Sequence, residues 1–383
     1  MHFELDEQQE QLHASLVRLL RDRAPFEGRR RLTEGERGWD PSLWPALAAL
    51  GVTALALPET DGGFGQRPVA LLPTLRALGA SLAIQPFLAT AVLAATALVR
   101  AGSDAQRRRL LPGIADGSRI VAFAHCEAGA RHQPLWIETR ARCVEGRWLL
   151  HGCKHNVLFG AEAGAFIVSA RDAHDTVRLF LLDPAQPGAK CDATRLIDDT
   201  PASDLTLSAA QAEPLPGEGL AALGAACDAG IAAICAEALG VAEHAYALTV
   251  EYVQARQQFG RAIGSNQAVR HRVAEMRVAL EMLRSAAMAG LLALEAQDDE
   301  ERSRELARAK MLVARHGLSV TQKAIQLHGG IGMTTEYGAG HCLRRMTVLD
   351  MLFGDGTCHA ARLGAALARG IVASDDGGPA AAP

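Results

Sequence analysis

The stretch "QLHGGIGMTTEY" (residues 326–337) follows a long helical pattern and places two adjacent glycines, Gly329 and Gly330, where that pattern stops. Glycine is the commonest residue just past a helix end, because it adopts the left-handed conformation without steric cost. A second interpretation is that a planar or anionic group approaches the main chain closely at this point. The glycines alone do not choose between the two.

The length and composition of the chain limit what it can fold into. Its 383 residues are too many for one simple core and indicate two or three domains or layers. With 49% hydrophobic and 21% charged residues, the chain can bury a large core. A net charge of −4, with acidic and basic residues interspersed, gives no general case for binding nucleic acid.

Cysteines, histidines and the N-terminal stretch argue against several kinds of site. The eight cysteines are scattered without a Cys-x-x-Cys pair, so neither a zinc site nor a disulfide framework follows. Five histidines (125, 155, 328, 341 and 359) include no pair at His-x-x-x-His spacing with an acidic third ligand, and we expect no metal. The N-terminus is rich in acid and Gln where a signal peptide is basic and then apolar, and no apolar run reaches membrane-spanning length. These features predict a cytoplasmic protein without a membrane span.

The composition and apolar spacing of the sequence change along the chain and predict four segments. Residues 1–119 are rich in Ala and Leu, with apolar residues at three- and four-residue intervals typical of helices. Residues 120–215 contain short runs of Phe, Ile, Val and Leu, as in a small β domain. Residues 216–372 hold long helical patterns with short loops, which predict an antiparallel bundle. The polar, Gly- and Pro-bearing segment 373–383 is expected to be a disordered tail.

Strand positions inside the β segment follow from local patterns. Glu145-Gly146 separates two strand-like runs within residues 136–154 and is a hairpin-turn signal. Three further strands are predicted by "AFIVSAR" (165–171), "VRLFLLD" (177–183) and "SDLTLSA" (203–209).

This order of helices, sheet and helix bundle, together with four local stretches, resembles the acyl-CoA dehydrogenase family of flavoproteins. The stretches are "LPETDGGFG" (57–65), "FAHCEAGARHQP" (123–134), "RQQFGRAIGSNQAVRHRVAEM" (256–276) and "QLHGGIGMTTEY". The last two are similar to the family's Arg-x-x-Phe-Gly and Gln-x-x-Gly-Gly-x-Gly motifs and are specific in combination. The resemblance implies an α+β fold with an N-terminal helical domain, a central small β-barrel-like domain and a C-terminal four-helix bundle.

The resemblance also implies FAD as the cofactor. In the family, the Arg-x-x-Phe-Gly loop reaches the pyrophosphate and adenine of FAD held mainly by a neighbouring subunit, and the Gln-Gly-Gly backbone lies along the dinucleotide. An anionic pyrophosphate is bound well by Arg and by backbone N–H groups. Each implicated residue alone also has a structural interpretation, such as a surface charge, a core anchor or a helix cap. The implicated residues are Arg256, Phe259, Gln267, Gln326, Gly329, Gly330 and Thr357.

Catalysis in this family needs a base that removes a proton from the carbon next to a thioester carbonyl. Many members use the Glu of a Tyr-Glu-Gly-Thr segment, and the matching residue of "MLFGDGTCH" (351–359) is Asp355, whose stem is one carbon shorter and reaches about 1.5 Å less. Asp355 could equally serve as a turn residue, or Thr357 as a helix cap. Other members carry a Glu early in the first long C-terminal helix, but that place falls near Gly230, with only Asp228 close by.

The β segment departs from the family pattern, which leaves three functions open. In "GCKHNVLFG" (152–160), Asn156 and Leu158 stand where the family has an aromatic residue and a flavin-contacting Thr. Such chains resemble the smaller subunits of heteromeric acyl-CoA dehydrogenases, including steroid-type ones. The leading hypothesis is FAD-dependent α,β-dehydrogenation of an acyl-CoA. The alternatives are a non-catalytic partner subunit and a nitroalkane-oxidase-like or other flavin oxidase or monooxygenase with Asp355 as its base. Expected partners are acyl-CoA, an electron acceptor such as an electron-transfer flavoprotein, and a second copy or a related subunit.

Overall fold

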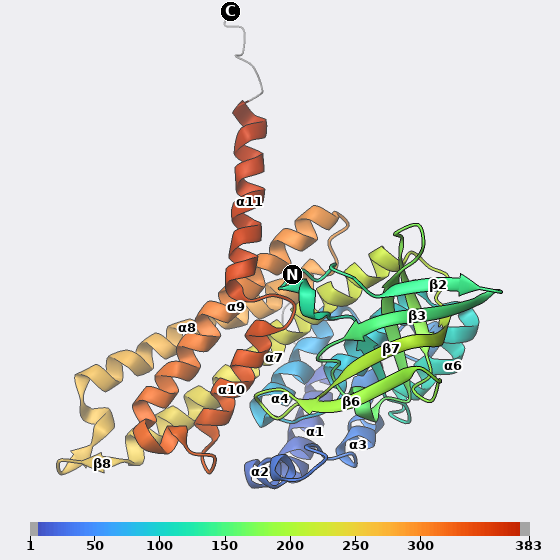
Figure 1. Ribbon diagram of the computed structural model, residues 1–383. Helices are drawn as coiled ribbons and strands as arrows, with labels where there is room; N and C mark the ends of the chain where they lie inside the picture. Colours follow the sequence, from blue (N-terminus) through green and yellow to red (C-terminus); the bar gives the residue numbers. More distant parts are fainter. Residues whose placement is uncertain (1–6, 376–383) are drawn as a thin grey trace, which may run out of the picture.

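The structure of the protein, a computed structural model, describes residues 7–375. The N-terminal helices and a seven-stranded sheet form one half of the molecule, and a bundle of long helices extends away from them (Figure 1). The α+β fold class expected from the sequence is confirmed.

The first part of the described chain is helical. Helix α1 (Glu7–Arg23) buries Leu16 and Leu20 on one face, as its three- and four-residue apolar spacing predicts. Helix α6 (Asp104–Ala115) begins with a capping box between Ser103 and Gln106. The π-helical segment η4 (Phe87–Ala94) continues directly into α5 (Ala95–Ala101) and lies against the sheet and the bundle. The remaining elements are α2 (Phe26–Glu34), α3 (Leu43–Ala49), η1 (Val52–Ala54), η2 (Glu59–Asp61), η3 (Pro68–Leu71) and α4 (Leu72–Ser81).

The sheet closes on itself in the manner of a small barrel. Its strands run in the order β1-β4-β2-β3-β7-β5, β5 also pairs with β4, and β6 pairs with β7. The ring formed by β4, β2, β3, β7 and β5 surrounds a core that includes Leu150, Phe166 and Phe180. The strands are β1 (Val121–Ala124), β2 (Arg140–Val144), β3 (Arg147–Lys154), β4 (Ala165–Arg171), β5 (Val177–Leu182), β6 (Ala189–Arg195) and β7 (Pro201–Pro214).

Local signals located most of these strands but missed two, β1 and β6. The predicted hairpin is confirmed, because β2 pairs antiparallel with β3 and the turn residues Glu145 and Gly146 have φ of 51° and 77°. Strand β6 was not predicted, because "AKCDATR" is largely exposed and charged and has no apolar alternation. It forms through seven paired positions with β7, and this neighbour extends well beyond the predicted 203–209.

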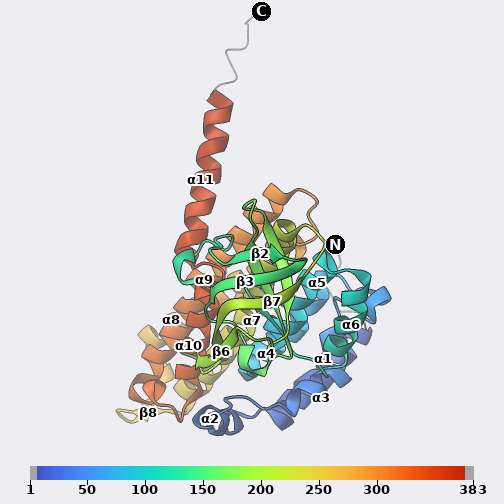
Figure 2. The ribbon, with the colours of Figure 1, turned by 45° about the vertical axis from the view of Figure 1, so that its right-hand side comes forward.

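The bundle consists of four packed helices and a fifth that projects from it. The packed helices are α7 (Gly219–Ala255), α8 (Gln267–Ala293), α9 (Asp299–His328) and α10 (Gly338–Met351). Helix α11 (Gly356–Asp375) starts against α9 and points away from the rest of the molecule (Figure 2). Residues 373–375 are therefore helical, which corrects the predicted start of the tail. The remainder of that tail, 376–383, lies outside the described residues.

Helix α7 is the central element of the bundle. It is long and apolar enough to cross a bilayer, but 67% of its most apolar window is buried inside the molecule. Its neighbours are α4, α8, α9 and α10, so its apolar surface faces other helices on several sides. A helix that is apolar around most of its circumference is expected at the centre of a bundle of this kind.

One largely covered arginine joins the three parts of the molecule. Arg345 of α10 donates from Nε to Glu237 Oε1 of α7 (2.7 Å) and from Nη1 to Asp198 Oδ2 (2.8 Å), just before β7. The Asp198 carbonyl accepts a hydrogen bond from Arg29 of α2 (2.8 Å). Burial acts against the charge of Arg345, but the two carboxylates outweigh burial and raise its pKa. Removing one partner would leave a buried charge, at a cost of about 3–5 kcal/mol.

Candidate functional site

The loop after α7 presents an arginine and a phenylalanine to solvent. Arg256 is the C-cap of α7, and the next residues form a small hairpin of β8 (Gln257–Gln258) and β9 (Arg261–Ala262). The hairpin turn is Phe259-Gly260, with φ of 52° and 80°. The Phe259 side chain is fully exposed, with a relative accessibility of 101%. An aromatic residue with a left-handed backbone and a fully exposed ring is energetically unfavourable. Such a residue is expected to contact a partner outside this chain.

The end of α9 supplies a bare stretch of backbone. Gly329 has φ of 64° and donates its N–H to the Ile325 carbonyl. It is therefore a helix cap, which was the first of the two interpretations of the glycine pair. A Cβ built at Gly329 or Gly330 would have no atom within 4 Å. The backbone of η8 (Gly329–Met333) is therefore also open to close approach from outside. Gln326, one turn earlier on α9, is exposed.

Three aromatic rings bring these two segments together. The ring centroids of Tyr252 and His328 are 4.5 Å apart, and those of His328 and Tyr337 are 4.8 Å apart. His328 is fixed by Nδ1 against the Ala324 carbonyl (2.7 Å) and by Nε2 against the Tyr337 hydroxyl (3.3 Å). Tyr252 lies one turn before Arg256, and its carbonyl accepts the Arg256 N–H (2.8 Å). Sequence reasoning missed Tyr252, since nothing in its spacing marks it as a partner of the glycine segment.

We call the residues at this end of the bundle the far-end group. Gln267 belongs to it because it is exposed and opens α8, after the hairpin and the short turn η7 (Ile263–Ser265). The β8 hairpin lies at the end of the bundle remote from the sheet in both views (Figures 1 and 2). The group is Arg256, Phe259, Gln267, Gln326, Gly329 and Gly330.

Asp355 lies elsewhere, in the turn between α10 and α11. Its Oδ1 accepts the Cys358 N–H (2.7 Å) and its carbonyl accepts the His359 N–H (3.1 Å). This is the geometry of an N-cap residue, one of the two roles that the sequence left open for it. Thr357 is exposed in the first turn of α11, so Asp355 rather than Thr357 caps this helix.

A buried lysine and a buried histidine flank that turn. Lys310 of α9, which is 1% exposed, donates to the Leu349 and Asp350 carbonyls (2.8 and 2.6 Å) at the end of α10. Burial lowers the pKa of Lys310. His359 Nε2 lies 3.1 Å from the Phe353 carbonyl, and burial, assisted by Arg362 and Lys310, lowers the pKa of His359 to about 4.

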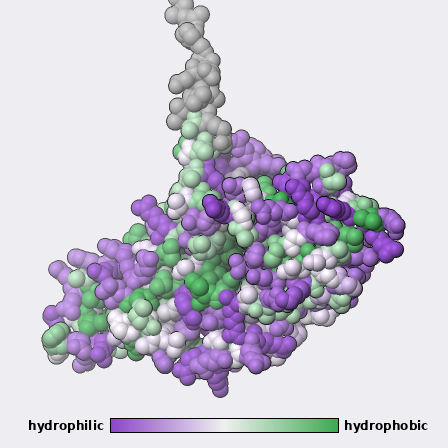
Figure 3. All heavy atoms as spheres, in the orientation of Figure 1, coloured by the Kyte–Doolittle hydropathy of each residue, from purple (hydrophilic) through white to green (hydrophobic). Residues whose placement is uncertain are grey.

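A cavity of about 680 Å³ lies between the sheet and this turn, and we call it the sheet-side cavity. Figure 3 shows apolar surface where the bundle and the sheet meet, and the wall residues are correspondingly apolar. They include Leu93, Phe123, Leu158, Leu352 and Phe353. Gly354 also lines the cavity, but Asp355 does not.

An ion pair supports the polar floor of this cavity. Glu127 lines it and accepts from the buried Lys154 Nζ (2.5 Å) and from the Thr139 hydroxyl (2.7 Å). Burial lowers the pKa of Lys154 to about 8, against the opposing effect of Glu127. Burial acts to raise the pKa of Glu127, but Lys154 holds it below its ordinary value. Glu127 is thus engaged as an anion in a structural pair.

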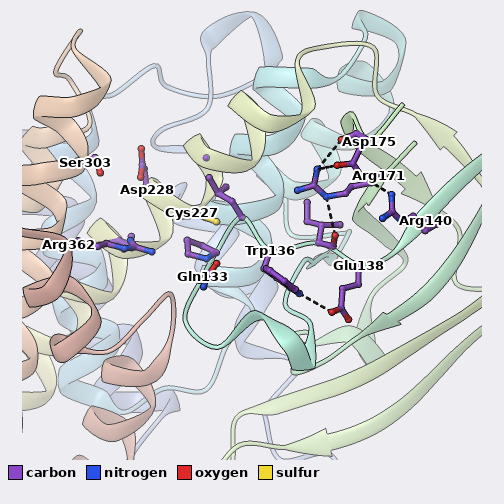
Figure 4. Close-up of a pocket in the computed structure, with 15 residues that line it drawn as sticks. Gln133, Trp136, Glu138, Arg140, Arg171, Asp175, Cys227, Asp228, Ser303 and Arg362 are labelled. Atoms are coloured by element: carbon purple, nitrogen blue, oxygen red, sulfur yellow. Dashed lines mark hydrogen bonds and ion pairs between the residues drawn. The ribbon is translucent and has the colours of Figure 1, made fainter. Parts of the chain in front are cut away.

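A second cavity, of about 810 Å³, opens beside the first, and its charged lining consists of three arginines and three carboxylates, of which Asp175 is paired with Arg140 and Arg171. We call it the arginine groove. Arg362 reaches from α11 toward the loop that carries Gln133, and its Nη2 donates to the His132 carbonyl (3.4 Å) (Figure 4). Arg140, Arg171 and the half-exposed Trp136 lie on its other side.

Neither candidate position on α7 offers a free carboxylate. Asp228 lines the groove, where burial raises its pKa against the ion pair that it makes with Arg302 (3.0 Å). At Gly230 an added Cβ would lie 2.7 Å from Phe353 Cζ and 2.9 Å from Leu93 Cδ2. In other members of the family that this sequence resembles, a Glu lies near this position. In this chain the Phe353 ring fills that place.

Comparison with known proteins agrees with this arrangement. The family model described as "Acyl-CoA dehydrogenase, C-terminal domain" matches residues 217–368, and the N-terminal domain model matches residues 6–118. The solved structure of a variant of the Tcur3481-Tcur3483 steroid ACAD is 31% identical, with a TM-score of 0.88 over 96% of this chain and 100% of the other. The chain belongs to the acyl-CoA dehydrogenase family.

Other members of the acyl-CoA dehydrogenase family extend this similarity. The acyl-CoA dehydrogenases FadE27 and IpdE2 of Mycobacterium tuberculosis are each 29% identical to this chain. The alignments cover 89% and 86% of this chain and 92% and 88% of the relatives. The ChsE4-ChsE5 complex of the same organism has a TM-score of 0.85 at 27% identity and covers 99% of this chain and 100% of the other. The expected family, of flavin-dependent oxidoreductases acting on CH–CH groups and of the divergent steroid type, is confirmed.

The far-end group fits the anionic half of FAD. The Arg256 side chain makes no hydrogen bond or ion pair with any residue that the structure describes, which leaves its guanidinium free for a phosphate. The bare backbone at Gly329 and Gly330 offers close approach beside it. The sheet-side cavity has room and apolar walls for a ring system, but Leu158, which is 9% exposed, supplies no hydroxyl to it. At the level of the family, the FAD expectation is confirmed.

Proposed function

We propose that this chain is one subunit of an FAD-dependent acyl-CoA dehydrogenase, and that its far-end group completes an FAD site whose other half lies on a second subunit. The separation of two groups carries this proposal. Lys310, which contacts the α10–α11 turn, and Gly329 are 19 residues apart along α9, or about 28 Å at 1.5 Å per residue. Because the far-end residues are exposed and lie at the other end of α9 from this chain's own cavity, a second subunit is needed to bring both halves together.

We propose a related subunit rather than a second copy as the partner. The names of the two similar structures, Tcur3481-Tcur3483 and ChsE4-ChsE5, each describe two components. This chain also departs from the family in the ring-facing half, at Leu158, while its far-end half keeps the family motifs. We therefore expect this chain to contribute more FAD-binding residues to its partner's site than to a site of its own.

The proposed reaction removes a proton and a hydride from adjacent carbons of an acyl-CoA thioester. FAD, when bound, accepts the hydride, and an acceptor such as an electron-transfer flavoprotein would later take the electrons. In this chain, Arg256 would hold the pyrophosphate as a charge-assisted pair, and the glycine backbone would let the dinucleotide approach closely. The arginine groove would attract the phosphates of CoA mainly through Arg362, because Arg140 and Arg171 are both paired with Asp175.

We propose that the catalytic base comes from the second subunit. A general base must face the reacting carbon within hydrogen-bond reach. Asp355 instead caps α11 and does not line the sheet-side cavity, and the Gly230 position is occupied by Phe353. Glu127, the carboxylate in that cavity, is held by Lys154.

A second candidate function is turnover by this chain's own site, with Asp355 as base. One observation favours it: among the residues that the structure describes, Asp355 Oδ2 has no hydrogen-bond partner, so the capping bond uses only one carboxylate oxygen. In this version the substrate is an acyl-CoA or, as in nitroalkane oxidase, a small acidic carbon compound.

A comparison of substrates on the natural assembly tests the proposed function. The chain is purified with a tag from its own organism, so that any second subunit accompanies it. We expect absorbance between 400 and 500 nm and acyl-CoA-dependent reduction of an artificial electron acceptor. Oxygen consumption with a nitroalkane but no reaction with acyl-CoA would overturn the proposal in favour of an oxidase.

A further inference from the structure

Trp136 is exposed at the wall of the arginine groove. The chain has four tryptophans, of which Trp39 and Trp44 are buried and Trp148 packs against Phe180, with 5.4 Å between the ring centroids. Trp136 instead lines the groove and is 42% exposed. Binding sites are typically lined by aromatic side chains, so an uncovered indole at a cavity wall indicates a contact for a ligand.

The indole ring is held in place by its own chain. Its Nε1 donates to Glu138 Oε1 (3.1 Å), and a Cβ added at Gly129 would lie only 3.0 Å from the same nitrogen. The next residue, Ile137, is buried, and its carbonyl accepts a hydrogen bond from Arg171 Nε (3.1 Å). Since the N–H edge of the ring is already used, a ligand in the groove would meet Trp136 through a ring face. A ring fixed in advance loses little entropy when that ligand binds.

A free cation lies across the groove from this ring. Figure 4 shows Trp136 on the loop between Arg362 on one side and Arg171 on the other. Arg362 donates to the His132 carbonyl (3.4 Å) and makes no ion pair with any carboxylate that the structure describes. An exposed aromatic ring and an unpaired guanidinium in one groove match a ligand that has both a flat ring and an anionic group.

Most other charges of the groove are already paired. Asp175 forms ion pairs with Arg140 (2.8 Å) and with Arg171 (3.1 Å), and Asp228 forms one with Arg302 (3.0 Å). Charge alone therefore gives the groove a weak hold on a phosphate. A nucleotide bound here needs a second contribution, and stacking on an exposed indole is one that proteins use for bases of any kind.

We propose that Trp136 is the stacking platform for the adenine of the acyl-CoA, with the phosphates of the same CoA at Arg362. The inference rests on the proposed function, because it assigns a subsite to the ligand of that function. Adenine is the flat aromatic part of CoA, and it stays in the groove, so the sheet-side cavity is left to the ring system of FAD. The acyl end passes along Gln133 and Pro134, which line both cavities, toward that ring system.

The size and salt dependence of the effect follow from stacking. Loss of an aromatic platform under a base is expected to weaken binding by about 5- to 100-fold. This factor should be the same at low and at high salt, because no charge is removed. A phosphate contact at an exposed arginine is screened by salt, so the effect of removing Arg362 should shrink as salt is added.

The test measures the binding of free CoA, and of its nucleotide half 3′-phospho-ADP, to the natural assembly by calorimetry. In Trp136→Leu, which keeps an apolar side chain but has no aromatic face, we expect the Kd of both ligands to rise at least ~5-fold at either salt concentration. Trp136→Phe restores an aromatic face and should stay within about threefold of the wild type. Arg362→Gln should raise the Kd mainly at low salt.

Two further measurements separate stacking from a general apolar contact. Leu135→Ala shortens the neighbouring exposed side chain of the same groove and should leave the Kd of CoA within about twofold. CoA should quench the tryptophan fluorescence of the wild-type assembly, and this quenching should be lost in Trp136→Phe, in which Trp39, Trp44 and Trp148 remain.

The possible failures are distinguishable. Unchanged CoA affinity in Trp136→Leu, or an equal loss in Leu135→Ala, would overturn this inference alone. Dissociation of the assembly in Trp136→Leu with unchanged CoA affinity would overturn it as well and would assign the indole to a subunit interface. A wild-type assembly that binds neither CoA nor an acyl-CoA would overturn the proposed function and this inference with it.

Discussion

The rings of Tyr252 and His328 lie with their centroids 4.5 Å apart, and this contact joins two segments that are 76 positions apart in the sequence. Tyr252 stands one helical turn before Arg256, and His328 immediately precedes Gly329. The pair therefore holds the end of α7 that leads to Arg256 beside the segment that begins with Gly329. Such preorganisation lowers the ordering cost of binding.

Loss of this contact should weaken FAD binding while leaving the fold intact. Tyr252→Leu removes an aromatic pair worth about 0.5–1.5 kcal/mol, so we expect the Kd for FAD to rise about 2- to 10-fold. The measurement is the recovery of flavin fluorescence as the assembly is diluted. Tyr246→Leu, also on α7 but outside the ring cluster, is the matched control. An equal loss in both variants would show that the helix, not the Tyr252–His328 contact, is responsible.

Arg256→Ala should release FAD without unfolding the chain. The side chain is exposed and makes no contact with the described residues, so its removal costs the folded chain little, whereas a charge-assisted phosphate contact is worth about 1.5–3 kcal/mol. We expect flavin content after dialysis to fall by at least ~10-fold and the oligomer to dissociate more readily in sedimentation. Arg277→Ala, on α8 and paired with Glu281, should retain its flavin. Full flavin retention in Arg256→Ala would remove this residue from the site.

The turn that carries Phe353 should loosen in mild acid. Burial lowers the pKa of His359 to about 4 from an ordinary 6.5, so the unfolded chain binds a proton between these values that the folded chain does not. The contribution of His359 to the free energy of unfolding is therefore fully present above about pH 6.5. It decreases as the pH falls toward 4, by up to about 3 kcal/mol. The check is urea unfolding at pH 7 and pH 5, with His359→Gln beside the wild type. A wild-type loss no greater than that of His359→Gln would assign the acid sensitivity to other groups.

Asp355→Asn should leave both stability and turnover nearly unchanged. Asn offers the same Oδ1 atom to the Cys358 N–H, and Asp and Asn cap helices about equally well. Asp355→Ala, which loses the cap, should cost about 1 kcal/mol in unfolding free energy. If Asp355 is the base after all, flavin reduction in Asp355→Asn would fall at least ~100-fold while unfolding stays as in the wild type.

Residues whose role is local were predictable, and those whose role depends on a distant partner were not. The Glu145-Gly146 turn and the cap at Gly329 follow from backbone preferences that each short segment carries in itself. Strand β6 has no such preference and forms because β7 offers it a free edge. The Tyr252–His328 contact and the Phe353 ring on Gly230 join segments that only the bundle brings together.

The residues of the candidate site also differ in how far the sequence alone could assign them. The far-end residues were recognisable because their motifs are contiguous in the sequence. The competing roles of Asp355 could be named from the sequence but not separated, because both need the same turn and the same side chain. The capping bond and the position of Asp355 outside the cavity wall favour the cap, and the role of Asp355 as base stays a prediction.

The completion of an FAD site across two subunits is most directly tested by native mass spectrometry of the purified assembly. The account predicts that FAD accompanies only oligomeric species, that this chain released as a monomer carries none, and that Arg256→Ala yields oligomers that have lost their flavin. A monomer of this chain that retains one FAD, with Arg256→Ala equally loaded, would contradict it.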